Sequence, residues 1–140
     1  MRAKTKVAAI TFAIAAGSVM ISAPTASAAT YCDSAGYTAT GEPMQRCTKL
    51  SNGVLVNWKT YNSDNYTHIH TRYDKTGGST VSVRLGYSMG SSTVYSSYFN
   101  ISSGGSSQKD WTKFGDSACT SSVGLLNYSG GTYQTPSAHC

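Results

Sequence analysis

Two histidines, His68 and His70, are separated by one residue in a segment that favours a β-strand. Alternate residues of a strand point to the same side, so both imidazoles could approach one metal ion. A third ligand would have to come from elsewhere in the chain, and His139 is the only other histidine. The alternative places both rings on the solvent face of the strand, opposite an inward Ile69, and we favour it. The sequence therefore predicts no metal centre and no cofactor.

Other arrangements typical of catalysis are also not indicated. A serine nucleophile requires a convergent histidine and carboxylate, and no serine of this chain has a context that suggests them. A glycosidase requires two carboxylates beside the scissile bond, and most of the six acidic residues fall in predicted turns or near the N-terminus. Asp110, next to Trp111, is the only one with a neighbour typical of sugar-binding sites. We therefore expect a protein that is not an enzyme.

The first 28 residues have the layout of a secretory signal peptide. Arg2, Lys4 and Lys6 form a charged start, an apolar run follows, and Ala26–Ala28 provides a cleavage site of small residues. The apolar run is too short and too rich in alanine to indicate a membrane span. We expect a secreted, extracellular protein whose mature chain begins near Ala29 and does not contact a membrane.

Four cysteines, Cys32, Cys47, Cys119 and Cys140, predict two disulfides in an oxidising compartment. We favour the pairs Cys32–Cys47 and Cys119–Cys140, because each closes a short loop and leaves the middle of the chain uncrossed. The main alternative is a nested arrangement in which Cys32 and Cys140 tie the two ends together. Zinc binding is not indicated, because no two cysteines have the C-x₂-C spacing of structural zinc sites.

Beyond residue 28 the chain is rich in Ser, Thr, Gly, Asn and Tyr, a composition that favours strands over helices. Alternating segments between turn sequences predict strands over residues 45–50, 54–61, 66–73, 80–89, 93–101, 111–114, 121–128 and 132–135. Residues 29–44 show no such alternation and are predicted to form an extended N-terminal arm before a single β domain of residues 45–140. The predicted fold class is all-β: a small antiparallel β-sandwich or barrel of about seven to eight strands with two disulfides.

The charge of the mature chain excludes one class of partner. Three of the eleven basic residues lie in the signal peptide, so eight remain against six acidic residues, a net charge of +2. No block of like charge is present, whereas binding to a nucleic acid depends on clustered basic side chains. We expect no nucleic-acid partner.

Aromatic side chains indicate a recognition surface instead. All ten tyrosines lie beyond residue 28, and a domain of this size cannot bury them all. A surface of Tyr, Ser, Gly and Asn is typical of adaptable binding sites; the alternative is that the tyrosines only cover sheet faces and pair across strands. The residues expected to contact a partner are Tyr31, Tyr37, Met44, Tyr61, Tyr66 and Trp111.

Two short stretches and the overall layout resemble known groups of small secreted bacterial proteins. Gly53–Ser63 (GVLVNWKTYNS) and the ending from Cys119 to His139-Cys140 are similar to the spore-associated protein group. The layout also resembles the small adaptor subunit of umbrella toxin particles, which joins a lectin-like subunit to a repeat-containing stalk, partly through an extended N-terminal segment. Neither resemblance assigns a function to a particular residue.

These observations favour a secreted, non-catalytic protein-binding adaptor or structural subunit of an extracellular assembly, such as an antibacterial toxin particle. The expected partner is another secreted protein. One alternative is a secreted inhibitor of an extracellular hydrolase that presents the loop of residues 62–65 or 102–108. Another is a module that binds carbohydrate or the cell wall through Trp58, Trp111 and surface tyrosines.

Overall fold

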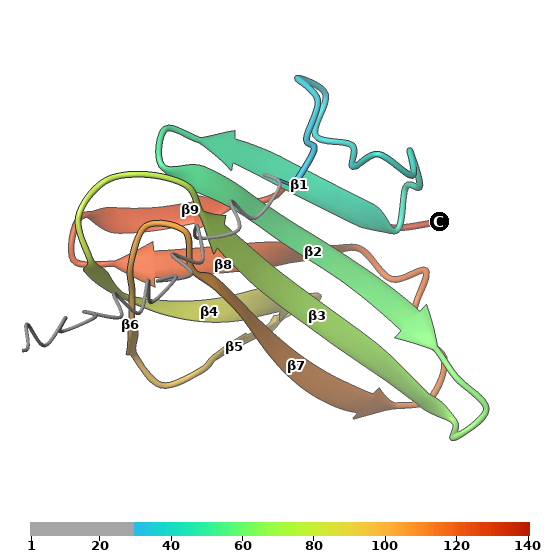
Figure 1. Ribbon diagram of the computed structural model, residues 1–140. Coiled ribbons are helices and arrows are strands. Elements are labelled where there is room, and N and C mark those ends of the chain that lie inside the picture. The colour runs from blue at the N-terminus through green and yellow to red at the C-terminus, as the bar shows by residue number, and fades with distance from the viewer. Residues whose placement is uncertain (1–29) are drawn as a thin grey trace, which may run out of the picture.

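The computed structural model describes residues 30–140, which form two antiparallel β-sheets packed as a sandwich (Figure 1). The strands are β1 (Gln45–Leu50), β2 (Gly53–Tyr61), β3 (Tyr66–Lys75), β4 (Val81–Met89), β5 (Ser92–Tyr95), β6 (Phe99–Ile101), β7 (Ser106–Phe114), β8 (Ser122–Tyr128) and β9 (Gly131–Gln134). The all-β prediction is confirmed, and the sheets form a sandwich, not a closed barrel. The predicted signal peptide lies outside the described residues. None of the described residues forms a helix that could cross a membrane.

The first sheet has the strand order β1-β2-β3-β7, and the second has the order β5-β4-β8-β9, with β6 also paired to β4. The described part of the chain has nine strands, more than predicted, because the segment 93–101 forms β5 and β6 with a break between them. At the break, the Ser96 backbone N–H and side chain both bond to the backbone of Leu85. β7 starts earlier than predicted, at Ser106, because β3 continues to Lys75 and offers it a partner.

β1 and β2 form a hairpin whose turn is Ser51-Asn52, and Gly53 already pairs with Leu50. Gly53 has a φ of 158°, and a Cβ there would lie 2.2 Å from the Asp74 carbonyl oxygen of β3. The glycine is therefore required by the close approach of a neighbouring strand.

β2 is buried on both faces, whereas its alternation predicts a strand with a single buried face. Inward-facing Leu55 contributes to the main core between the sheets, which also contains Tyr73, Val83, Leu85, Ile101 and Leu126. Outward-facing Val54 and Val56 pack against Cys47 and Cys32, because residues 30–44 fold over this part of the sheet. Both rows of β2 are therefore apolar at its start.

The middle of the sandwich is thin and polar. A Cβ at Gly124 of β8 would lie 2.6 Å from the Asn57 Cβ of β2, so large side chains do not fit between these strands. The Asn57 amide donates to the His70 carbonyl at 2.9 Å, and the Ser122 hydroxyl donates to Asn57 Oδ1 at 3.2 Å. The Thr71 hydroxyl donates to the Gly86 carbonyl of the second sheet at 2.9 Å. These buried polar groups are satisfied by one another and by backbone, as burial requires.

The predicted disulfide pairs, Cys32–Cys47 and Cys119–Cys140, are confirmed, and they indicate an oxidising environment. The first fastens residues 30–44 to β1. Within this segment, which contains several turns, Tyr37 bridges to Arg46, whose guanidinium carbon lies 4.0 Å from the centre of the Tyr37 ring. The second disulfide joins the β7–β8 connection to the last residue.

Lys59 of β2 points into the sandwich and is only 2% exposed. Its ammonium group donates to the Thr120 carbonyl and, at 3.0 Å, to the Ala138 carbonyl. No ion pair among the described residues includes it. Burial therefore lowers the pKa of Lys59 from its usual 10.5 to about 8.

Replacement of this lysine tests the consequence for stability. The unfolded chain keeps the ordinary pKa. Between pH 8 and 10.5, Lys59 is therefore mostly protonated in the unfolded chain and mostly neutral in the folded chain. The free energy of unfolding rises with pH across this window, because the unfolded chain binds more protons there. We expect the free energy of unfolding of the wild type, relative to Lys59→Met, to increase by about 2 kcal/mol between pH ~7 and ~9.5 in denaturant titrations. Tyrosine ionisation affects both proteins equally. A difference that stays constant with pH would contradict the assignment.

Candidate functional site

The outward side of β2, β3 and β7 carries a continuous group of aromatic and charged side chains. The register of these strands places Trp58 opposite His70 and His70 opposite Asp110. Neighbouring rows place other polar and aromatic residues on the same side. We name the β2–β3–β7 face by these members: Trp58, Tyr66, His68, His70, Arg72, Gln108, Asp110 and Phe114.

Flat side chains are arranged in parallel across the centre of this face. The His70 ring stacks on Trp58, with centroids 4.7 Å apart and planes 18° apart. The His68 ring is nearly parallel to that of His70, with centroids 6.4 Å apart. The Arg72 guanidinium carbon lies 5.9 Å from the centre of the Trp58 ring. The face is thus built from rigid planar groups whose positions the strands fix.

Each imidazole of the face is held by a carboxylate. His70 Nδ1 lies 2.6 Å from Asp110 Oδ1, and His68 Nε2 lies 2.8 Å from Asp64 Oδ2. The Gln108 amide also donates to Asp110 Oδ1, at 2.7 Å. The structure therefore places both histidines on the outward side of β3, opposite buried Ile69. No group of three or more potential ligands in residues 30–140 is arranged to hold a metal ion.

These contacts shift the pKa values of the two acidic side chains, Asp64 and Asp110. A hydrogen bond from the Tyr66 backbone N–H, at 3.0 Å, together with that of His68, holds the pKa of Asp64 below its usual value. Partial burial raises the pKa of Asp110, but the hydrogen bonds from His70 and Gln108 outweigh it, and the pKa is lowered. Both carboxylates therefore stay ionised in mildly acidic solution.

Exposed aromatic rings mark the end of the face. Phe114, at the end of β7, is 75% exposed and meets the Tyr66 ring edge-on, with centroids 5.5 Å apart. Tyr61, the last residue of β2, is 42% exposed but belongs to the row of Lys59, on the other side of the sheet. Tyr66 and Phe114 are opposite each other in the outward row of His68 and His70, so both rings point away from the second sheet. This end of the first sheet also projects beyond the second sheet (Figure 1).

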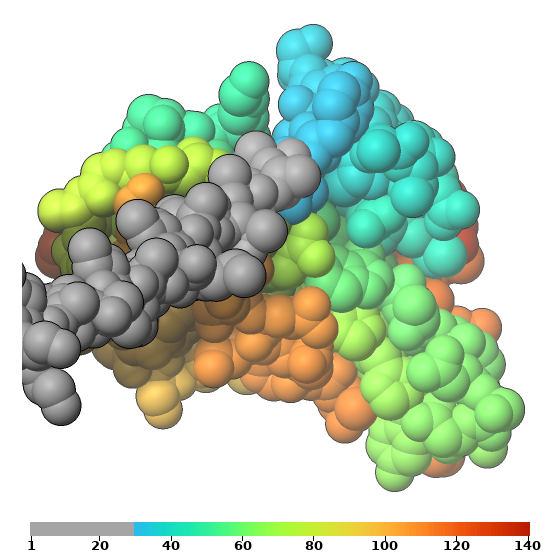
Figure 2. Space-filling view, viewed as in Figure 1, coloured from blue at the N-terminus to red at the C-terminus, as the bar shows by residue number. Residues whose placement is uncertain are grey.

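The residues predicted to bind a partner fall in three places. Tyr61 and Tyr66 lie at the aromatic end just described. Tyr31, Tyr37 and Met44 belong to the N-terminal segment, where Tyr31 is 60% exposed and the other two are half-buried. In the space-filling view (Figure 2) this segment, in blue, lies away from the end where the green β2–β3 turn meets orange β7.

Trp111, the sixth predicted residue, points into the sandwich. Its ring lies 5.2 Å from that of Tyr87 in the second sheet, and it packs against the buried cluster of Ile69, Tyr87 and Met89. Trp58 points to the opposite side of the first sheet. A sugar site that uses both tryptophans, as the sequence suggests, is therefore not formed.

Two features of the chain escaped the sequence analysis. Phe114 was assigned no role, because only the register of β7 with β3 places it on the outward side, beside Tyr66. The segment Gly86–Gly90 (GYSMG) has the G-x-S-x-G spacing of a nucleophile elbow, which was overlooked. In the structure it lies in β4 and the following turn, without the helix that an elbow requires, and the Ser88 hydroxyl is bonded to that of Thr93 at 3.0 Å.

Comparisons with protein-family models, curated proteins and solved structures gave no match to this chain. The resemblance to spore-associated proteins and to umbrella-particle adaptors therefore stays a prediction.

The coupling between His70 and Asp110 can be tested by titration. In His70→Phe a flat ring still stacks on Trp58, but Asp110 loses its hydrogen bond to the imidazole and the charge beside it. The partial burial of Asp110, which raises its pKa, remains. We expect the pKa of Asp110, followed by NMR of its carboxyl carbon, to rise relative to the wild type. The matched variant His68→Phe should raise it less, because His68 acts only through its charge. An unchanged Asp110 pKa in His70→Phe would contradict the described contact.

Proposed function

We propose that this chain is a secreted, non-catalytic protein-binding subunit that contacts another extracellular protein through the β2–β3–β7 face. The observation that carries the proposal is the exposed Phe114–Tyr66 pair at the end of an otherwise polar, rigid face. Large exposed aromatic groups held in place by a scaffold are typical of the residues that dominate protein interfaces.

The chemistry of the face supports this use. Aromatic residues and arginine are enriched at protein interfaces, and lysine and glutamate are depleted; the face contains Trp58 and Arg72 and neither lysine nor glutamate. Its two carboxylate contacts, His68–Asp64 and His70–Asp110, are made within the protein. Charges that are already paired lower the cost of removing water when a partner binds.

Its rigidity supports the same conclusion. Strands fix the backbone of every residue on the face, and the stacked rings have few rotamers to lose. Binding therefore costs less conformational entropy than it would for a loop. The two disulfides and the predicted signal peptide are consistent with a partner met outside the cell.

Removal of the exposed ring tests the proposal. We expect Phe114→Ser to weaken binding of the partner by about tenfold or more, because an aromatic side chain that anchors an interface contributes about 2 kcal/mol. The tagged protein, expressed in its producing cells and recovered from their medium, would be compared with the variant by quantitative mass spectrometry of co-purified proteins. Stability should change little, since this side chain is mostly in solvent.

The matched control is Tyr98→Ser. Tyr98 is 53% exposed, but its hydroxyl donates to Asn127 of β8, in the second sheet. This variant should retain the partner. Equal recovery of every co-purified protein with Phe114→Ser and wild type would reject the proposed face. A hydrolase held by the 62–65 turn, which lies between Tyr61 and Tyr66, would be one form of such a partner and would be lost with the same variant.

A second candidate function is carbohydrate binding, favoured by the Trp58–His70 stack with Gln108, Asp110 and Arg72 around it. A flat ring can pack against the apolar C–H face of a sugar, and the neighbouring polar groups can bond to its hydroxyl groups. If this is the function, wild type should sediment with an insoluble cell-wall polysaccharide and Trp58→Ala should not, whereas Phe114→Ser should bind as the wild type does. No sedimentation of the wild type with any polysaccharide tested would dismiss it.

A further inference from the structure

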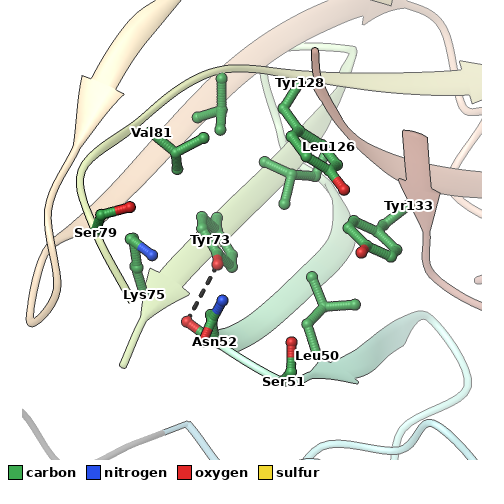
Figure 3. A pocket seen from close by; sticks show the side chains of 11 residues that line it. Leu50, Ser51, Asn52, Tyr73, Lys75, Ser79, Val81, Leu126, Tyr128 and Tyr133 are labelled. Carbon is green, nitrogen blue, oxygen red and sulfur yellow. Dashed lines mark hydrogen bonds between the residues drawn. The ribbon is translucent and has the colours of Figure 1, made fainter. Parts of the chain in front are cut away.

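A cavity of about 200 Å³ opens between the two sheets near the β1–β2 turn, at a different place from the β2–β3–β7 face (Figure 3). It lies between the inward side of β3 in the first sheet and the inward sides of β4, β8 and β9 in the second. The walls of this cavity differ sharply in chemistry, and that difference carries an inference independent of the proposed function.

One wall is apolar and aromatic. Leu126 of β8 lines it together with the rings of Tyr128 and Tyr133, which stack nearly parallel, 5.8 Å apart between centroids and 7° between planes. Leu50, at the end of β1, closes the same side (Figure 3). Tyr133 is 42% exposed, so this wall reaches the surface. A flat apolar group would be covered here on several sides.

The opposite wall carries a buried cation. Lys75, at the end of β3, is 3% exposed, and Figure 3 shows its nitrogen turned toward the space in front of Tyr73. Its ammonium group has three N–H donors but, among residues 30–140, bonds only to the Gly77 carbonyl. No carboxylate in residues 30–140 forms an ion pair with it. The Tyr73 hydroxyl is already committed to the Asn52 carbonyl at 3.1 Å.

A buried ammonium with donors to spare and no counter-ion favours an anion within reach. An anion that also carries a flat apolar group would satisfy both walls at once. Size agrees with this, because a cavity of about 150 Å³ holds one benzene molecule, and the present cavity, at about 200 Å³, leaves room for a carboxylate in addition.

We infer that this cavity binds a small aromatic carboxylate, with the carboxylate on the Lys75 ammonium and the ring against Leu126, Tyr128 and Tyr133. The ligand class is a free organic acid of about the size of phenylacetate. Its binding requires no change in the β2–β3–β7 face, and neither proposal depends on the other.

Calorimetric titration of the purified protein tests the charge requirement. Phenylacetate should bind about tenfold or more tightly than neutral phenylacetamide, and cationic phenethylamine should not bind. Lys75→Met should abolish the preference for phenylacetate over phenylacetamide. Lys113→Met, which removes an exposed lysine of β7 outside the cavity, should preserve it.

A measurement on the wild type keeps the inference testable if Lys75→Met does not fold. Intermolecular NOEs from the phenylacetate ring protons should reach the Leu126 methyl groups and the Tyr133 ring. Absence of phenylacetate binding, equal affinity for acid and amide, or NOEs only to residues outside the cavity would each overturn the inference.

Discussion

The antiparallel register that joins β2, β3 and β7 determines both the interior of the protein and its candidate binding face. Successive residues of a strand point to opposite sides, so Ile69 enters the core while His70 stacks on Trp58 outside. A shift of one residue would exchange these two sets of side chains along the whole strand. The stack, the carboxylate contacts and the Phe114–Tyr66 pair all exist because this register is held.

Directional hydrogen bonds in the thin middle of the sandwich hold this register. A core made only of aliphatic side chains would tolerate a shifted strand more easily than one in which Asn57 must meet the His70 carbonyl and Ser122. Thr71 and Lys59 act in the same way, because each donates from the first sheet to a backbone carbonyl outside that sheet. The buried lysine costs stability at neutral pH, and its contacts fasten the segment that the second disulfide closes. The polar interior and the ordered outer face are thus two results of one arrangement.

Local sequence was sufficient for most of the strands, most turns and the disulfide pairs, since turn residues, alternation and short loops are properties of neighbouring residues. Local sequence could not assign the two faces of β2, because Val54 and Leu55 are both apolar. Val54 points outward and is buried only because residues 30–44 fold over it. Trp111 was expected to contact a partner, whereas its ring packs inside against Tyr87 of the other sheet, a contact that no local pattern shows. The exposed end of the face depends on the pairing of β3 with β7, which no local pattern encodes.

Site-specific photo-crosslinking can detect the proposed contact between the β2–β3–β7 face and another protein. A benzophenone amino acid would be introduced at position 114, and separately at position 98 on the second sheet, in the protein expressed by its producing cells. Illumination of the secreted fraction should give a discrete adduct of higher mass from position 114 and none from position 98. An adduct from position 98 alone, or no adduct from position 114, would refute the proposed contact.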